Sequence, residues 1–89
     1  MAIEFDPDKD ERNKEKHGIS LRRAEDLDIH EALTAKDERF DYGEDRYVAI
    51  GPIGGEIYVL VYTWRGSKVR AIGLRRASEK EQNRWSIKR

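Results

Sequence analysis

The chain has 89 residues, of which 40% are charged and 37% hydrophobic, and its 18 basic and 18 acidic residues leave a formal net charge of zero. This length favours one small domain, residues 1–89, with a modest core. The absence of cysteine excludes disulfides and thiolate metal sites, and no apolar run is long enough to span a membrane. The N-terminal residues lack a signal-peptide pattern, so we expect a cytoplasmic protein.

The charges are unevenly distributed along the chain. Residues 1–45 contain 8 basic and 15 acidic residues, a balance of −7, whereas residues 46–89 contain 10 and 3, a balance of +7. A basic half favours an anionic partner such as nucleic acid. The alternative is that the two halves attract each other within the fold.

The N-terminal segment predicts a short strand followed by a helix. Residues 2–5 are typical of a short strand at a sheet edge. Asp6 suits the N-cap position and Pro7 the first helical position, while Gly18 suits the left-handed position that ends a helix. We therefore predict a helix from residue 7 to about residue 17.

This predicted helix has no apolar stripe. Lys9, Asn13 and either Lys16 or His17 share one face at spacings of three and four residues. The polar face itself is then expected to pack or to bind a partner.

A second helix is predicted to begin after Ser20, which suits an N-cap. Its apolar side would cover the core face of the sheet; it consists of Leu21, Ala24, Leu27 and, if the helix is long enough, Leu33. Residues 35–45 are polar and favour a loop that leads into a short strand.

Residues 46–76 predict three antiparallel strands joined by two tight hairpins. Gly54-Gly55 and Gly66-Ser67 suit the centres of two-residue turns, which need positive φ angles. Counting outward from these centres pairs Tyr47 with Tyr62 in the first hairpin. In the second hairpin it pairs Tyr62 with Ala71, Val59 with Leu74 and Tyr58 with Arg75.

Alternation of side chains along these strands predicts two different faces. The aliphatic face, expected to pack against the helices, contains Val48, Ile50, Val59, Val61, Ile72 and Leu74. The other face is expected to be open to a partner and contains Tyr47, Ala49, Tyr58, Leu60, Tyr62, Ala71, Gly73 and Arg75.

The C-terminal residues predict a third helix. Ser78 and Glu81 have the spacing of a capping box, so the helix should run from residue 79 to about residue 87. Trp85 and Ile87 are its only large apolar residues, and a partner could complete its packing. The expected fold class is α+β, with a small antiparallel sheet of three main strands plus short edge strands, two N-terminal helices and one C-terminal helix.

Several short motifs occur together in this chain. They are F-x-x-x-K and N-x-x-K-H-G-I-S near the N-terminus, G-E-x-R and Y-T-x-R in the middle, and R-R-A-S after the last strand. In this pattern the sequence resembles the BrnT toxins of bacterial type II toxin–antitoxin systems over nearly its whole length. The matching positions are Phe5, Lys9, Asn13, Lys16, His17, Gly18, Ile19, Ser20, Ala24, Gly43, Glu44, Arg46, Tyr62, Thr63, Arg65, Arg70, Ile72, Arg75, Arg76, Ala77, Ser78, Glu81 and the aromatic Trp85.

The sequence departs from that family in the last strand and near the C-terminus. Ala71, Gly73 and Leu74 stand where the family has Ile, Ser and Ala, and Trp85 stands where it usually has Tyr. The resemblance implies a RelE-like ribonuclease that cleaves RNA and inhibits translation. It also implies neutralisation by a cognate BrnA-type antitoxin in a hetero-oligomer, which represses its own operon and contacts operator DNA only through the antitoxin.

RNA cleavage by the 2′-hydroxyl needs an acid, a base and cations near the phosphate, but no metal or other cofactor. The candidate catalytic residues are His17, Arg65, Arg70, Arg75 and Glu44. Two structural alternatives stay open. Glu44 could form a salt-bridge network with the arginines of a row that contains Arg46, Thr63 and Arg70, and His17 could serve only to stabilise the end of its helix.

Candidate RNA-binding residues are Arg46, Tyr47, Tyr58, Tyr62 and Arg76, because arginines bind phosphate and aromatic rings stack on bases. Tyrosines are also ordinary residues of strands. Trp85 is the candidate antitoxin contact, and His30 among carboxylates does not make a convincing metal site. Two other functions remain open, a nucleic-acid-binding module without catalysis and a protein-interaction module.

Overall fold

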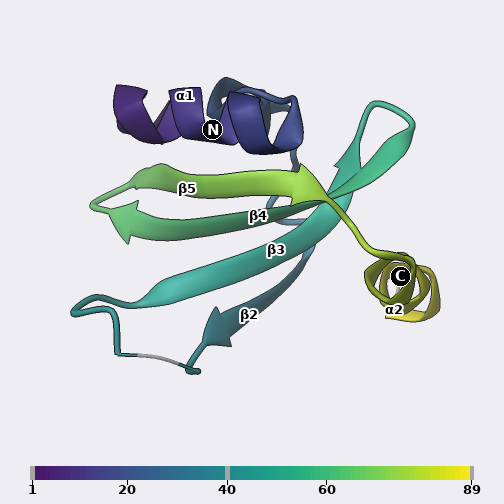
Figure 1. Cartoon of the computed structure of the whole chain (residues 1–89). Helices are drawn as coiled ribbons and strands as arrows, with labels where there is room; N and C mark the ends of the chain where they lie inside the picture. Colours follow the sequence, from purple (N-terminus) through teal and green to yellow (C-terminus); the bar gives the residue numbers. More distant parts are fainter. Residues whose placement is uncertain (1, 40, 89) are drawn as a thin grey trace.

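The computed structural model describes residues 2–39 and 41–88 of the chain, and within them one mixed sheet carries five strands in the order β1-β5-β4-β3-β2 (Figure 1). The strands are β1 (Ile3–Glu4), β2 (Leu33–Asp37), β3 (Arg46–Ile53), β4 (Glu56–Arg65) and β5 (Lys68–Arg76). The helices are α1 (Pro7–His17), the 3-10 helix η1 (Leu21–Asp26) and α2 (Glu79–Lys88). The α+β class is confirmed, but the sheet is not purely antiparallel, because β1 pairs parallel to β5.

The two faces of the sheet are covered by different helices. Helices α1 and η1 lie on one side, and α2 lies on the other side at one end of the sheet (Figure 1). The larger core lies under α1 and η1 and consists of Ile19, Leu21, Ala24, Leu27, Ala49, Ile53, Leu60, Tyr62, Val69, Ala71 and Leu74. The smaller core lies under α2 and consists of Ile50, Val59, Ala77 and Trp85.

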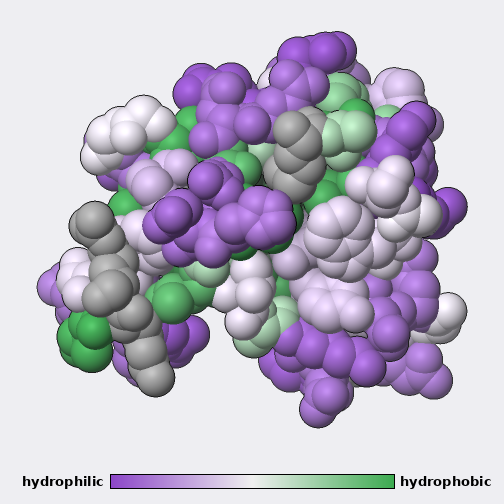
Figure 2. Space-filling model, turned by 180° about the vertical axis from the view of Figure 1, so that it is seen from behind, coloured by the Kyte–Doolittle hydropathy of each residue, from purple (hydrophilic) through white to green (hydrophobic). Residues whose placement is uncertain are grey.

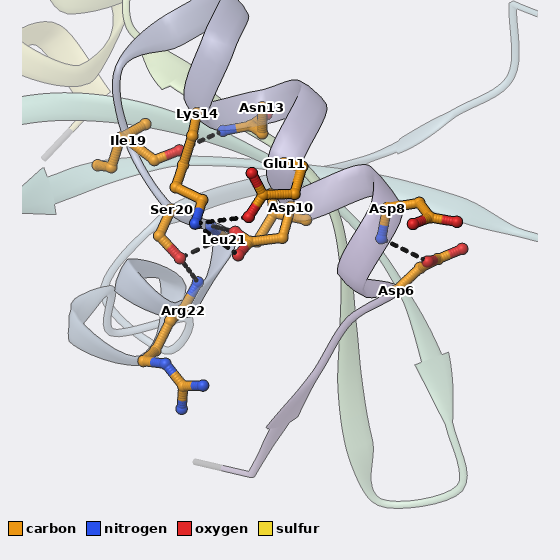
Figure 3. Close-up of polar contacts among 10 residues, drawn as sticks. All are labelled: Asp6, Asp8, Asp10, Glu11, Asn13, Lys14, Ile19, Ser20, Leu21 and Arg22. Atoms are coloured by element: carbon orange, nitrogen blue, oxygen red, sulfur yellow. Dashed lines mark hydrogen bonds and ion pairs between the residues drawn. The ribbon is translucent and has the colours of Figure 1, made fainter.

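Helix α1 has the predicted ends. The side chain of Asp6 accepts a hydrogen bond from the Asp8 N–H at 2.9 Å (Figure 3). Gly18 ends the helix with φ 72°. Both features satisfy backbone groups that a helix end leaves unpaired. The helix boundaries predicted from the sequence are therefore confirmed.

Asn13 docks this polar helix on the edge of the sheet. Its Nδ2 group donates to the carbonyls of Ile19, at 2.9 Å, and Leu74, at 2.8 Å, while its Oδ1 accepts from the Leu74 N–H at 3.1 Å. Asn13 is 7% exposed, so these bonds are shielded from water. The expectation that a polar face packs is confirmed for this residue.

The segment after α1 differs from the prediction. Residues 21–26 form a 3-10 helix rather than a longer α-helix, and Leu27 is already extended at its C-cap. Leu33 belongs to strand β2 and not to a helix, and the strand continues to Asp37 through a stretch predicted as loop. The exposed, polar pattern of β2 explains this error, because an edge strand with one neighbour needs few apolar residues.

The two hairpins form where the turn glycines predict them. Gly54 and Gly66 both have φ 63°, and Tyr47 pairs with Tyr62 as expected. The second hairpin keeps the predicted register only as far as Tyr62 and Ala71. A β-bulge then makes Ile72 an extra residue, so Leu74 pairs with Leu60 rather than Val59.

The bulge moves Leu74 to the opposite face, and the predicted roles of the two faces are wrong. The tyrosine face lies under α1 and η1, whereas the aliphatic face is covered in part by α2. Small residues on the tyrosine face, such as Gly51, let the helical layer approach the backbone of the sheet closely. A Cβ atom at Gly51 would stand 2.8 Å from the Leu27 Cδ1 atom.

Helix α2 has the predicted capping box, in which the Glu81 N–H donates to Ser78 Oγ at 3.2 Å and the Ser78 N–H donates to Glu81 Oε1 at 2.8 Å. On the face shown in Figure 2, hydrophobic side chains form small patches between hydrophilic ones. No helix within the described residues is long and apolar enough to cross a membrane.

Candidate functional site

A basic groove lies between α1 and the bulge of β5. It has a volume of about 360 Å³ and is lined by Lys9, Arg12, Asn13, Lys16, His17, Ile72 and Gly73. Four of these seven residues are Lys, Arg or His, and no carboxylate belongs to the lining. The groove therefore suits an anionic ligand.

Two acidic residues of α1, Asp10 and Glu11, lie on another side of the helix. Asp10 and Glu11 both pair with Lys14, at 3.7 and 2.9 Å (Figure 3). The Asp10 carboxylate also accepts hydrogen bonds from Ser20 Oγ and the Leu21 N–H. These contacts fix the start of η1 and keep negative charge out of the groove.

His17 lies at the end of α1 where the groove meets β5. Partial desolvation lowers the pKa of its imidazole below 6.5, and the positive charges of Lys16 and Arg75 lower it further. The imidazole is therefore mainly neutral at pH 7 and above. In that form one ring nitrogen can accept a proton from a substrate hydroxyl.

Arg75 is held in place by α2. Its Nη1 and Nη2 groups donate to the two carboxylate oxygens of Glu81, at 2.7 and 2.9 Å, and Nη1 also donates to the Arg76 carbonyl at 3.3 Å. These contacts use three of the five N–H donors of the guanidinium. Within the described residues, two donors thus remain for a phosphate oxygen.

The same contacts affect Glu81. The bidentate bond from Arg75 lowers the pKa of the Glu81 carboxyl from 4.5 to about 2, against the opposing effect of burial. Because this pKa is depressed in the folded state, the stabilisation is present above pH 4.5 and is lost as the pH falls towards 2.

We expect the Glu81→Gln variant to be about 1–2 kcal/mol less stable than the wild-type protein at pH 7, since it loses a partly exposed charge-assisted pair. Urea unfolding at several pH values should show this difference shrinking between pH 5 and pH 2. Glu79→Gln is the control, because Glu79 is exposed in the same helical turn. A difference that does not change with pH would contradict the assigned role of the pair.

Two of the other predicted arginines, Arg46 and Arg65, gather around Glu44 at a different part of the sheet. Glu44 lies 3.7 Å from Arg46 and 3.6 Å from Arg65, so the salt-bridge alternative is realised for these two arginines. The Arg46 guanidinium also lies 4.1 Å from the centre of the Tyr42 ring. This cluster holds the start of β3 and leaves Arg65 half exposed.

Arg70 belongs to neither group. It pairs with Thr63 across the strands as predicted, and its Nη1 donates to Glu4 Oε2 at 3.2 Å. Thr63 Oγ1 donates to the Asp45 carbonyl at 2.6 Å. The charge of Arg75 acts on the His17 imidazole, although Arg75 pairs with α2 and does not line the groove, and Glu44, Arg65 and Arg70 lie at the other end of the strands.

The sequence matches the model of a known protein family. Residues 5–81 match the model of the ribonuclease toxin BrnT of type II toxin–antitoxin systems. The chain belongs to the BrnT family.

The structure is also similar to the crystal structure of the ribonuclease toxin BrnT of Brucella abortus. The TM-score is 0.72 and the sequence identity 28%, with 89% of this chain and 99% of that chain covered. No curated protein matches the sequence. Membership of the BrnT family makes this chain a ribonuclease toxin with RNA as the substrate class and an antitoxin as the partner class.

In this BrnT-family chain the tyrosines do not form an open stacking surface. Tyr62 is 2% exposed and stacks on Tyr47, with ring centroids 5.6 Å apart. Tyr47 and Tyr58 pack at the margin of the larger core. The prediction that Tyr62 stacks on RNA bases is wrong, because α1 and η1 cover this face.

Trp85 and Arg76 also have structural contacts. Trp85 is 7% exposed and packs against the sheet in the smaller core, so the outer surface of α2 does not present it to an antitoxin. Ile87 is 80% exposed on the same helix. Arg76 forms an ion pair with Glu56 across the β4–β5 pairing.

Within residues 2–39 and 41–88, no group of three or more His, Asp or Glu side chains is arranged to hold a metal ion. The sequence placed Lys9 and Lys16 on a polar helical face expected to pack or to bind, but it assigned neither of them nor Arg12 to the RNA site. Lys9 and Arg12 are three residues apart, and Arg12 and Lys16 are four residues apart. This spacing in the sequence could have indicated a basic face, because it places all three side chains on one side of a helix.

Proposed function

We propose that this BrnT-family chain is a metal-independent endoribonuclease whose cleavage centre lies at His17 and Arg75. His17 would take the proton from a 2′-hydroxyl, whose oxygen then attacks the adjacent phosphorus. The bond from phosphorus to the 5′-oxygen breaks, and that oxygen takes a proton from solvent. The products are a 2′,3′-cyclic phosphate and a 5′-hydroxyl end.

The observation that carries this proposal is a mainly neutral imidazole in a basic groove, within electrostatic reach of a guanidinium that α2 holds in place. The lowered pKa of His17 keeps its imidazole in the neutral form, which is the form that accepts a proton. Arg75 is fixed by Glu81 and retains donors for the charge that develops on the phosphate. A fixed donor needs little reorganisation when the transition state forms.

The remaining predicted site residues have supporting roles in this proposal. Arg65, which is half exposed beside Glu44, and Arg70, beside Glu4, would contact RNA away from the cleaved bond. Glu44 would orient Arg46 and Arg65 rather than transfer a proton, because it lies between their guanidinium groups.

The cellular role proposed is inhibition of translation in the cytoplasm by a RelE-like toxin. A BrnA-type antitoxin would neutralise the enzyme in a hetero-oligomer, and the complex would repress its operon with the antitoxin contacting operator DNA. Helix α2 is the proposed antitoxin contact, with exposed Ile87 in place of buried Trp85 as the side chain that supports it.

Purified protein is expected to cleave single-stranded RNA in the presence of a chelator, and the 5′ fragments should end in a 2′,3′-cyclic phosphate. The Arg75→Ala variant should lower kcat by about 10²–10³-fold, since it removes donors to the phosphate. Gel analysis with end-group mapping measures both results. Arg23→Ala is the control, because Arg23 is an exposed arginine of η1 paired only with Asp26.

Cleavage that requires added metal would contradict the proposed mechanism. RNA binding without any cleavage would instead support a non-catalytic nucleic-acid-binding module.

A further inference from the structure

The basic face of α1 extends well beyond the proposed cleavage centre. Lys9, Arg12 and Lys16 all line the groove that ends at His17. At a rise of 1.5 Å per residue, the first and last of them are about 10 Å apart along the helix axis. This row is long enough to contact more than one phosphate of a nucleic acid strand.

We propose that Lys9, Arg12 and Lys16 form a track that binds the sugar-phosphate backbone of single-stranded RNA next to the cleaved bond. The proposal rests on the proposed function, which places the cleaved bond at His17. The row of side chains then lies along the path of the substrate on one side of that bond.

Within the described residues, no carboxylate lines the groove or pairs with the side chains of the track. In this part of the chain, residues 2–39 and 41–88, no ion pair or hydrogen bond joins the side chain of Lys9, Arg12 or Lys16 to another residue, whereas the Lys14 side chain on the same helix contacts both Asp10 and Glu11. An unpaired cation in a groove can neutralise a phosphate without first breaking an internal salt bridge. Helix α1 thus has two kinds of cationic side chain. Lys14 forms ion pairs within the helix, and the three residues of the track face the groove, where a ligand can bind.

Asn13 fixes the direction in which the track faces. Its bonds to Ile19 and Leu74 prevent rotation of α1 about its axis, so the basic face stays beside the bulge of β5. Gly73 forms part of the groove floor without a side chain, and only Asn13 Oδ1 would come within 4.0 Å of a Cβ placed there. Gly73 therefore places no side chain in the way of an RNA strand that lies along the helix.

The chemistry of the track favours a nucleic acid backbone over an acidic protein segment. Lysines are flexible point charges that bind phosphates without reading the base sequence. In addition, the row is continuous with the His17 imidazole, which can accept a proton from a ribose hydroxyl but offers nothing particular to a carboxylate.

The test compares two double variants that each remove two lysine charges. Lys9→Gln/Lys16→Gln alters the track, and Lys14→Gln/Lys80→Gln is the matched control, with one lysine on the other side of α1 and one exposed on α2. The probe is a short single-stranded RNA with 2′-O-methyl groups, which cannot be cleaved by its own hydroxyl. Fluorescence anisotropy gives its Kd over a range of salt concentrations, and circular dichroism confirms folding.

The slope of log affinity against log salt should become shallower by about 1.4 in the track variant, since each lost contact to a single strand removes about 0.7. The control should keep the wild-type slope. With cleavable RNA at pH 8, the track variant should raise KM and leave kcat nearly unchanged.

Equal slopes in the two double variants would overturn the track, even if wild-type protein cleaves RNA. Absence of cleavage by wild-type protein, with the expected difference in slopes, would reject the proposed function while the binding track stands.

Discussion

Asn13→Ala is expected to destabilise the protein by about 3–5 kcal/mol, because it leaves the buried N–H and C=O groups of Leu74 and the Ile19 carbonyl without their partner. Each unsatisfied buried group costs roughly 1–3 kcal/mol, and some of that cost is relieved by local movement. A small domain has a total stability of only about 5–15 kcal/mol. Urea denaturation followed by circular dichroism should therefore show a large fall in the transition midpoint.

Asn83→Ala provides the matched control. Asn83 is also a helical asparagine, but it is exposed on α2. Its replacement should change stability by less than about 0.5 kcal/mol. Similar effects at Asn13 and Asn83 would show that the three hydrogen bonds of Asn13 do not hold α1 on the sheet.

His17→Gln is expected to reduce kcat for RNA cleavage by about 10²–10⁴-fold, the usual contribution of a general base. In the wild-type protein, kcat/KM should rise with pH as the imidazole loses its proton and level off above a pKa that is lower than 6.5. The variant should lose this rising limb. Initial rates measured from pH 5 to pH 8.5 with a labelled RNA test both expectations.

His30→Gln is the control for this experiment, because His30 is exposed in the segment between η1 and β2, away from the groove. It should retain the wild-type rate and pH profile. If His17→Gln keeps the rising limb and most of kcat, then His17 only stabilises the end of α1 and another group takes the proton.

Much of the fold could be predicted because local signals specify it. The ends of α1 follow from Asp6, Pro7 and Gly18, and the hairpins follow from Gly54 and Gly66, whose positive φ angles are compatible with glycine. These features depend on residues close in sequence. They need no knowledge of the distant packing partners.

The bulge in β5 could not be recovered by assuming unbroken alternation. Val69, Ala71 and Leu74 are buried on one face, and their spacings are two and then three residues. The odd spacing was the only local sign of an inserted residue. A count from the turn alone moves Leu74 to the wrong face, and the roles of the neighbouring tyrosines are then misassigned.

The composition of the two faces was also misleading. An aliphatic face is expected to be the main core, yet the larger helical layer covers the face with tyrosines and small residues. Ala49, Gly51 and Ala71 allow the backbone of the sheet to approach η1 and α1 closely. Small residues in a strand therefore indicated close packing here and not an exposed binding surface.

The site was predicted in part for similar reasons. His17 and Arg75 were both candidates, but the position of His17 beside β5 depends on the packing of α1, to which the long-range hydrogen bonds of Asn13 with Leu74 contribute. The partner of Arg75 could not be identified from the capping box alone. Glu81 takes part in the box and in the pair with Arg75 at the same time.

The contact between Asn13 and Leu74 has a consequence for association between copies of the chain. β5 has β4 on one side, and on the other side the two-residue strand β1 pairs only with Val69 and Arg70. A strand with free N–H and C=O groups is a template on which another chain can add a strand. The Asn13 amide has the same donor and acceptor as a peptide group and occupies both groups of Leu74. One side chain thus blocks the addition of another strand at Leu74, in the part of β5 that β1 is too short to cover.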